Sequence, residues 1–423
     1  MPTRVRIKLK PQIQNPKPKN KEIKMKKLYT TLVLSLSLDA QTLQETIDYS
    51  IQNNYQLQIL KEESSIIGEQ KEIEGFWADP VLKVGINDIQ AVRPLSRNIE
   101  AMQNQYVSIS QSIPLSNRLK VASQIEEEKK NVIEEKVEAL KVNIAFGVRK
   151  AFIDATNAQK TLDILDEYIA FLNTPMNLLI NLSAIERNSV EKYIKTQLLQ
   201  KSYQLQRENA LQRQEIAKEN IELIGNLKID NFSDEVLLRR YEQLPLEELL
   251  AQIKEQSPEL AMATALKEVA SRAVELAREK EQADITVIGG YYQRFDRNDY
   301  LSFAVSYPLY THGKQERQKV QAMKRANIQD ITYKQAKVQL EQGLKISLHE
   351  LKALYQELEI LEQSRVKILK LIANAKSELV SGGSLVHYYE LFSQKTNNAL
   401  NINKKRLSVA LIENRITQLL GEI

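Results

Sequence analysis

Histidine, cysteine and acidic side chains are the residues through which most proteins bind metals or carry out catalysis. The chain has three histidines, His312, His349 and His387, and none lies at the short spacing from another that a metal site uses. It has no cysteine, so thiol nucleophiles and thiolate ligands are absent. No phosphate-binding glycine loop, dinucleotide fingerprint or nucleophile elbow occurs. We therefore expect no catalytic residue, no metal, no cofactor and no enzymatic activity.

The remaining candidate functional residues lie in two polar segments, here called breaks, which interrupt otherwise helical sequence. They are ERNSVEKYIKTQ (186–197) and VSGGSLVHYYELFSQ (380–394). The turn residues within them are Asn188, Ser189, Gly382, Gly383 and Ser384. The charged or aromatic residues that follow are Glu191, Lys192, Tyr193, His387, Tyr388 and Glu390. At the end of a helical hairpin, such side chains either hydrogen-bond to neighbouring chains or form an ordinary solvated surface, and both interpretations stay open.

The composition favours long helices over a thick globular core. The 423 residues include only 12 Gly and 11 Pro, and aromatic residues make up 6%, which suits uninterrupted helices in thin layers. The formal net charge of +5 comes from the N-terminus. Residues 1–40 hold ten Lys/Arg and two Asp/Glu, which leaves 49 basic and 52 acidic groups in residues 41–423. The body therefore gives no electrostatic reason to expect nucleic acid as a partner.

The N-terminal residues have the layout of an export signal. After Met25, two lysines precede the apolar stretch Thr30–Leu38, and Ala40 is a small residue before polar sequence, as in a secretory signal peptide. The apolar stretch is shorter than the roughly 20 residues that span a bilayer. We predict a signal peptide over residues 25–40 and, in residues 1–24, a disordered leader or a mis-assigned start. The alternative is the first helix of a cytosolic protein.

The body of the chain contains a duplicated sequence. YVSISQSIPL (106–115) is matched by YLSFAVSYPL (300–309), with Tyr, Ser, Ser, Pro and Leu at the same places. The upstream segments VLKVGI and ITVIGG also correspond, as do the helical sequences on both sides. Each half runs helix, strand, loop, strand, very long helix, break and long helix, which indicates internal duplication. We predict two repeats, residues 41–240 and 241–423, with a longer loop between the strands of the first.

A very long helix is predicted in each repeat. No proline lies between Ser116 and Phe171 or between Thr311 and Ser381, and a helix of roughly 60–70 residues extends about 90–105 Å. In the first repeat, apolar residues recur at gaps of three and four, which is a heptad seam with one irregularity near Gly147. The seam consists of Ile133, Val137, Leu140, Ile144, Val148, Ala151, Ala155, Ala158, Leu162, Leu165, Ile169 and Leu172. We therefore expect long, closely paired helices.

The strand segments alternate between apolar and polar residues. The apolar set is Val107, Ile109, Ile113, Leu301, Phe303, Val305 and Tyr307, interleaved mainly with Ser and Tyr. This alternation over about ten residues is typical of a transmembrane β-strand, and a half-buried soluble strand alternates in the same way. Four strands cannot close a barrel, and open edges are not tolerated in lipid. A membrane sheet therefore requires two copies of the chain, giving eight strands, or three, giving twelve.

The strand-to-helix junctions and the two breaks resemble those of the TolC family of outer-membrane efflux proteins, over about residues 41–423. The most specific junction segments are SISQSIPLSNRLK (108–120) and SFAVSYPLYTHGK (302–314). The family's junction has Pro followed by Leu or Ile and then a basic segment that contains a glycine. The second repeat matches this pattern through Gly313, whereas the first repeat has Asn and Arg118 where the glycine is expected.

The resemblance implies a mainly α fold with a small membrane β-barrel. Three copies would form a homotrimer with one 12-stranded β-barrel, whose apolar set faces outer-membrane lipid, and a coiled-coil α-barrel tunnel in the periplasm of a Gram-negative bacterium. The segment 226–245 and both chain ends would form a belt around the tunnel. Such a protein is the outer-membrane channel of a tripartite efflux system. It conducts substrates passively to the exterior from a periplasmic adaptor protein and an inner-membrane pump.

The resemblance also suggests roles for the residues of the two breaks. The turn residues would be the tips on which the adaptor docks, and the charged and aromatic residues after them are a candidate periplasmic gate. The alternative from another class is a periplasmic coiled-coil scaffold that never enters a membrane. Membrane fractionation distinguishes these two readings. The six Met show no periodic cluster, so drugs, metal cations and proteins all remain candidate cargo.

Overall fold

The protein is represented by a computed structural model, which describes residues 42–183, 187–229, 232, 241–380 and 384–423. All of these residues belong to one unit, which begins at Ala40. The predicted leader and signal peptide lie outside the described residues, and so do the predicted tip residues Gly382 and Gly383.

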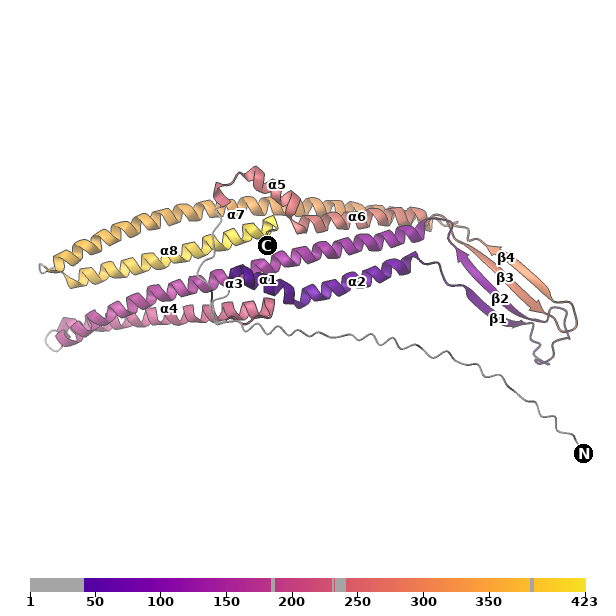
Figure 1. Cartoon of the computed structure of the whole chain (residues 1–423), viewed down its shortest axis with the longest axis horizontal. Coiled ribbons are helices and arrows are strands. Elements are labelled where there is room, and N and C mark those ends of the chain that lie inside the picture. Colours follow the sequence, from indigo (N-terminus) through magenta and orange to yellow (C-terminus); the bar gives the residue numbers. More distant parts are fainter. Residues whose placement is uncertain (1–41, 184–186, 230–231, 233–240, 381–383) are drawn as a thin grey trace, which may run out of the picture. The chain divides into compact units, whose positions relative to one another are not determined.

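The two halves of the chain contain the same order of helices and strands (Figure 1). The first half has α1 (Leu43–Asn53), α2 (Tyr55–Gly75), β1 (Val81–Asn87), β2 (Asn104–Ile113), α3 (Arg118–Ser183) and α4 (Arg187–Gly225). The second half begins with the 3-10 turn η1 (Tyr241–Gln243) and continues with α5 (Leu246–Gln256), α6 (Pro258–Glu279), β3 (Ile285–Gln293), β4 (Tyr300–Ser306), α7 (Lys314–Val380) and α8 (Leu385–Leu420). This repeated order is the one that the duplicated sequence predicts.

A short break divides the first two helices of each half at corresponding places. Asn54 separates α1 from α2, and its side-chain oxygen accepts hydrogen bonds from the backbone N–H groups of Gln56 and Leu57, at 2.9 and 3.1 Å, as an N-cap residue does. Ser257 occupies the corresponding place between α5 and α6, and Pro258 follows it. Proline suits the first helical position because the N–H group there has no partner within the helix.

α3 extends beyond the proline-free segment that predicts it, and α7 lies within its own. α3 and α7 span 66 and 67 residues, so each is about 100 Å long. α3 continues through Pro175 to Ser183, although a proline removes one helical hydrogen bond. The heptad seam is the buried stripe of α3, with Val148 and Leu165 fully buried.

Both halves build their cores in the same way. α3 packs against α4, α2, α6 and α8, and α7 packs against α6 and α8 (Figure 1). Gly147 of α3 approaches α4 so closely that a Cβ atom there would lie 2.8 Å from Ile224 Cδ1, whereas a Cβ atom on Gly343 of α7 would make an ordinary contact with Leu419 of α8 at 3.7 Å. Among the described residues, no helix has both the length and the apolar character that crossing a membrane requires.

The four strands form one antiparallel sheet in the order β1-β2-β3-β4. Its central pair, β2 with β3, joins the two halves of the chain, with Ile109 opposite Gly289. Within the described part of the chain, the outer edges of β1 and β4 have no strand beside them. The sheet therefore presents two free edges, whose unpaired N–H and C=O groups can pair with another strand.

Candidate functional site

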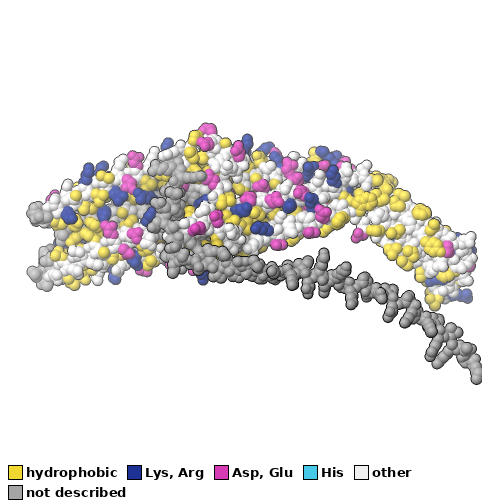
Figure 2. All heavy atoms as spheres, viewed as in Figure 1, with side chains coloured by type: hydrophobic (Ala, Val, Ile, Leu, Met, Phe, Trp, Pro, Cys, Tyr) yellow, Lys and Arg dark blue, Asp and Glu magenta, His cyan; other side chains and the backbone are white. Residues whose placement is uncertain are grey.

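The register of the sheet places an apolar set of side chains on one face, because residues directly opposite each other on neighbouring strands point to the same side. Leu82, Ile109 and Phe303 share one row across the sheet with Gly289, and the other rows of this face add further apolar residues together with Gln105, Gln111 and Gln293. We call this the apolar face; it consists of Leu82, Val84, Ile86, Val107, Ile109, Val287, Tyr291, Leu301, Phe303 and Val305. Figure 2 shows hydrophobic side chains over the part of the molecule that the strands form.

All ten side chains of the apolar face are exposed, with Val84 at 74% and Phe303 at 80%. Monomeric proteins in water rarely expose a contiguous apolar area of this kind, which marks a surface that binds protein or membrane. Five residues of the apolar set predicted from sequence belong to this face. Of the other two, Ile113 is the last residue of β2, opposite Ile285, and Tyr307 directly follows β4.

The opposite face of the sheet, which we call the polar face, carries mostly Ser, Tyr, Thr and Asn. One row across it contains Lys83, Ser108, Gly290 and Ser302. The next row toward the β1–β2 and β3–β4 loops contains Gly85, Tyr106, Tyr292 and Tyr300. The sheet therefore separates an apolar from a polar surface, as the wall of a membrane pore does.

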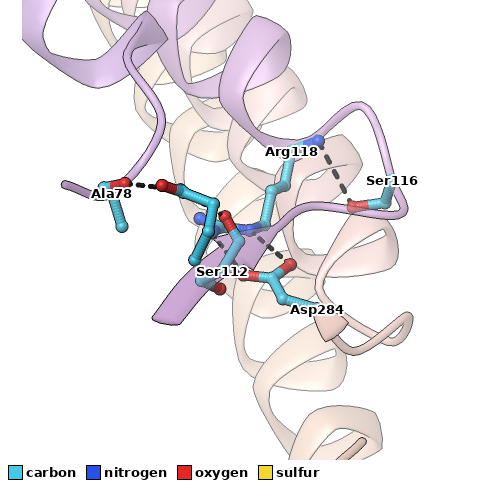
Figure 3. A network of polar contacts seen from close by, with 6 residues as sticks. Ala78, Ser112, Ser116, Arg118 and Asp284 are labelled. Atoms are coloured by element: carbon cyan, nitrogen blue, oxygen red, sulfur yellow. Dashed lines mark hydrogen bonds and ion pairs between the residues drawn. The ribbon is translucent and has the colours of Figure 1, made fainter. Parts of the chain in front are cut away.

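Polar contacts tie the junction between β2 and α3 to the connection between α6 and β3, and Figure 3 shows the pairing of Arg118 with Asp284. Arg118, at the start of α3, donates through Nε and NH2 to the two carboxylate oxygens of Asp284, which directly precedes β3. The backbone N–H of Asn117 donates to Glu279 of α6 at 2.7 Å. A guanidinium and a carboxylate paired through two parallel bonds fix each other's orientation. Arg118 therefore has a defined partner at the first junction.

The second junction keeps its glycine for a backbone reason. Gly313 has φ +63° and no atom within 4 Å of the place that a Cβ would occupy. The left-handed conformation costs a residue with a side chain about 1–2 kcal/mol. Gly313 therefore suits the junction because its backbone adopts the left-handed conformation. A side chain at this position would not be crowded by its neighbours.

Replacing Gly313 with alanine is expected to lower the free energy of unfolding by about 1–2 kcal/mol. The matched control is Gly68→Ala in the interior of α2, where a Cβ also meets open space and where alanine should raise stability by about 0.5–1 kcal/mol. Urea unfolding of the full chain in detergent, followed by circular dichroism, measures both changes. If both substitutions changed the free energy of unfolding by the same amount in the same direction, the left-handed backbone of Gly313 would not be the reason for its glycine.

The candidate gate and docking residues lie at the ends of the paired helices. Glu191, in the first turns of α4, forms an exposed ion pair with Lys195 at 2.6 Å, and the hydrogen bond from Lys195 lowers the pKa of Glu191. Tyr193 is half-buried and Lys192 is exposed. Asn188 and Ser189 lie in the first turn of α4.

On the other hairpin, Ser384 caps α8 by accepting a hydrogen bond from the backbone N–H of His387 at 3.4 Å. His387 and Glu390 are exposed, and Tyr388 is half-buried. Among the described residues, no three His, Asp or Glu side chains are grouped closely enough to hold a metal ion.

An aromatic cluster behind these residues was not foreseen from the sequence. It consists of Tyr168, Phe171, Tyr203, Tyr388, Tyr389 and Phe392. The rings of Phe171 on α3 and Phe392 on α8 stack with centroids 3.8 Å apart. Tyr168, also on α3, meets Tyr203 of α4 edge to face at 4.7 Å, and its burial raises the pKa of its hydroxyl. The cluster therefore joins the α3/α4 hairpin to the α7/α8 hairpin through α8.

A second link between the halves lies farther along the same helices. Asn157 of α3 donates to the backbone oxygen of Asn403 of α8 at 2.9 Å, and Asn403 donates back to the backbone oxygen of Asn157 at 3.1 Å. Asn403 is 6% exposed and its side-chain nitrogen also donates to Thr161 Oγ1 at 2.9 Å, so this buried amide has two partners on α3. The reciprocal pair therefore fixes the register of α3 against α8.

Comparison with known proteins places this arrangement among membrane channels. No family profile and no curated protein sequence matches the chain. Several solved structures do match it. The MtrE outer membrane channel of Neisseria gonorrhoeae, in its open state, has a TM-score of 0.72 and 17% identity over 90% of this chain and 89% of that one. The fold is that of outer-membrane channels.

Two further structures are similar to the same extent. The CmeC outer membrane channel of Campylobacter jejuni has a TM-score of 0.73 and 15% identity over 91% of this chain and 86% of that one. The outer membrane protein VceC of Vibrio cholerae has a TM-score of 0.71 and 14% identity over 90% of this chain and 96% of that one. The likeness spans nearly the whole chain and is one of fold. It confirms the prediction of a mostly helical protein with a small sheet.

Proposed function

We propose that the protein is a member of the TolC family and forms the outer-membrane channel of a tripartite efflux system. The observation that carries the proposal is the four-stranded sheet, which has one exposed apolar face, one polar face and two free edges. This sheet lies in a chain with the fold of outer-membrane channels. In water, the sheet would expose Phe303 and Val84 almost completely, whereas in a bilayer the same exposure is favourable.

The free edges require more than one copy of the chain, and the family resemblance makes that number three. Unpaired backbone groups are not tolerated in lipid, so β1 and β4 must each find a partner strand. The order β1-β2-β3-β4 is antiparallel throughout, so β4 of one copy and β1 of the next run antiparallel when copies are arranged in a ring. Three copies then close a barrel of twelve strands, in agreement with what the family resemblance implies.

The proposed barrel sets the orientation of the rest of the chain. The apolar face contacts lipid of the outer membrane of a Gram-negative bacterium, and the polar face lines the pore. The helices of the two repeats, residues 41–240 and 241–423, form an α-barrel tunnel in the periplasm after export by the signal peptide. Substrates then pass from an inner-membrane pump and a periplasmic adaptor through the channel to the exterior. The channel itself conducts them passively.

The far ends of the helical hairpins are the proposed sites of docking and gating. The adaptor contacts the turn residues Asn188, Ser189, Gly382, Gly383 and Ser384. Glu191, Lys192, Tyr193, His387, Tyr388 and Glu390 form the periplasmic gate. In the closed state these side chains hydrogen-bond between copies, and adaptor docking favours a second, open state. Tyr388 belongs both to the proposed gate and to the aromatic cluster, where its ring centroid is 6.0 Å from that of Phe171.

Reconstitution in planar bilayers tests both the channel and the gate. The wild-type protein should conduct ions weakly, and the double variant Tyr193→Ala with Tyr388→Ala should raise the single-channel conductance several-fold. The two Tyr→Phe variants, which lack only the hydroxyl groups, separate hydrogen bonding from packing. If the wild type and all variants insert and conduct equally, the proposed gate is wrong. If no form of the protein conducts, the proposed channel is wrong.

A further inference from the structure

Three tyrosines lie side by side on the polar face of the sheet, in the row that contains Gly85. The rings of Tyr106 and Tyr292 are stacked with centroids 5.2 Å apart, and those of Tyr292 and Tyr300 with centroids 4.9 Å apart and planes within 7°. They come from β2, β3 and β4, and the register puts them directly opposite one another. We call this arrangement the tyrosine row.

Two glycines make space for the tyrosine row. A Cβ atom on Gly85 would lie 2.6 Å from the ring of Tyr106, and one on Gly290 would lie 2.9 Å from the ring of Tyr292. Because both distances are under 3.0 Å, a side chain at either glycine position would displace the neighbouring tyrosine ring. The ring of Tyr106 therefore covers the backbone of β1, an aromatic–glycine contact that stabilises sheets.

The stacking determines which part of each ring remains available. Tyr292 is covered by its neighbours in the row, and Tyr106 lies between Tyr292 and Gly85. Stacked rings cover one another's negative faces, so the tyrosine row offers mainly ring edges and phenol hydroxyls. Ring edges carry the positive part of the aromatic quadrupole.

Two cations and one carboxylate lie beside the tyrosine row: Lys83, Arg294 and Asp299, whose carboxylate accepts hydrogen bonds from the backbone N–H of Arg294 at 2.8 Å and from the hydroxyl of Tyr291. Lys83 is the only charged residue in the sequences of the four strands. It is exposed, and it lies on the polar face in the row next to Tyr106. The guanidinium of Arg294 lies over the ring of Tyr300, 5.1 Å from its centroid. The two cations therefore flank the tyrosine row, with Lys83 beside its β1 end and Arg294 over its β4 end.

We propose that the tyrosine row, with Lys83 and Arg294, is a contact site for planar aromatic solutes that carry a negative charge. An aromatic solute can set its negative face against the ring edges of the row, the edge-to-face geometry that aromatic pairs prefer. Its anionic group then lies beside one of the two cations, Lys83 at the β1 end of the row or Arg294 at the β4 end. The inference rests on the proposed function, since it requires the polar face to line the pore. In a closed barrel of three copies, the tyrosine rows would form a collar near one mouth of the pore.

Blocking of single-channel current tests the proposal. The probe is naphthalene-2-sulfonate, compared with methanesulfonate, which lacks the ring, and with a naphthyl-trimethylammonium ion, which reverses the charge. We expect naphthalene-2-sulfonate to interrupt the current of the wild-type trimer with the longest dwell times. In Tyr106→Ala and Tyr292→Ala the dwell time should fall about fivefold to tenfold, the range that one aromatic contact provides.

The matched controls are Tyr106→Phe, Tyr292→Phe and Lys83→Gln. The Phe variants keep the ring edges and should keep most of the dwell time. Lys83→Gln should shorten the dwell time of naphthalene-2-sulfonate and lengthen that of the naphthyl cation. If the alanine variants fail to assemble, the Phe and Gln variants and the comparison of the three probes still decide the question.

Each outcome bears on a different claim. A wild-type channel that conducts but holds the three probes equally briefly overturns the aromatic-anion site and leaves the proposed function intact. A longer dwell time for the naphthyl cation than for naphthalene-2-sulfonate also overturns it. If the protein never conducts, both the proposed pore and the proposed aromatic-anion site are wrong.

Discussion

Replacing Phe303 with arginine is expected to abolish insertion of the protein into the outer membrane. Phe303 is 80% exposed and lies in the middle of the apolar face, opposite Gly289. An arginine on the lipid face of a barrel costs about 2–4 kcal/mol at the bilayer midplane, and a trimer would carry three of them. The amount of protein found in the outer-membrane fraction should therefore fall by at least about tenfold, which corresponds to 1.4 kcal/mol.

The neighbouring residue provides the matched control for this change. Ser302→Arg places the same side chain on the same strand, but on the polar face beside Gly290. In a water-filled pore an arginine there stays hydrated, so the protein should insert and assemble as the wild type does. Equal losses from both substitutions would show that the two faces do not differ in what they contact. The apolar face would then not be the lipid-facing surface.

The second large effect is expected from Phe392→Ala in the aromatic cluster. Phe392 stacks on Phe171 at 3.8 Å and lies parallel to Tyr168 at 6.5 Å, so it contributes the main apolar contact between α8 and α3 near the tips. Removing a buried Phe side chain costs about 3–5 kcal/mol, and we expect roughly 3 because Phe392 is half-buried. The equilibrium between joined and separated hairpins should shift about 100-fold. In planar bilayers, the mean open time should rise strongly.

Lys395→Gln is the control for this prediction. Lys395 pairs with Glu167 of α3 at 2.6 Å, and Glu167 is 60% exposed, so this ion pair also connects α8 to α3. The Lys395 ammonium lies over the Phe392 ring, 4.5 Å from its centroid, a contact that both substitutions remove, so the two variants differ in the ion pair and the aromatic packing. Exposed ion pairs contribute only about 0.2–1 kcal/mol, so the open time should change by less than about fivefold. A larger effect for Lys395→Gln than for Phe392→Ala would mean that surface charge holds the hairpins together and that aromatic packing does not.

Local patterns in the sequence were sufficient to predict the elements of this fold. The alternation at 106–115 and 300–309 predicted β2 and β4, although β4 ends at Ser306, because Pro308 cannot donate to a strand ladder. The heptad seam predicted the buried stripe of α3. Both signals repeat every two to four residues, which is the distance over which secondary structure is determined.

The contacts that define the candidate sites were not predictable in this way. Arg118 and Asp284, or Phe171 and Phe392, lie far apart in the sequence, and their pairing depends on how the two halves pack. The tyrosine row depends on the register of three strands, since a shift of one residue would move Tyr106 to the other face. A partial signal was present for the aromatic cluster, because Tyr388, Tyr389 and Phe392 are spaced to share one side of a helix.

The central claim is that strands from separate copies of this chain complete one another in a membrane. Light scattering on the full chain, after extraction of the membrane fraction and size-exclusion chromatography in detergent, measures the number of copies directly. We predict a detergent-bound particle of three chains and little protein in the soluble fraction. A monomer that is soluble in water without detergent would contradict the claim.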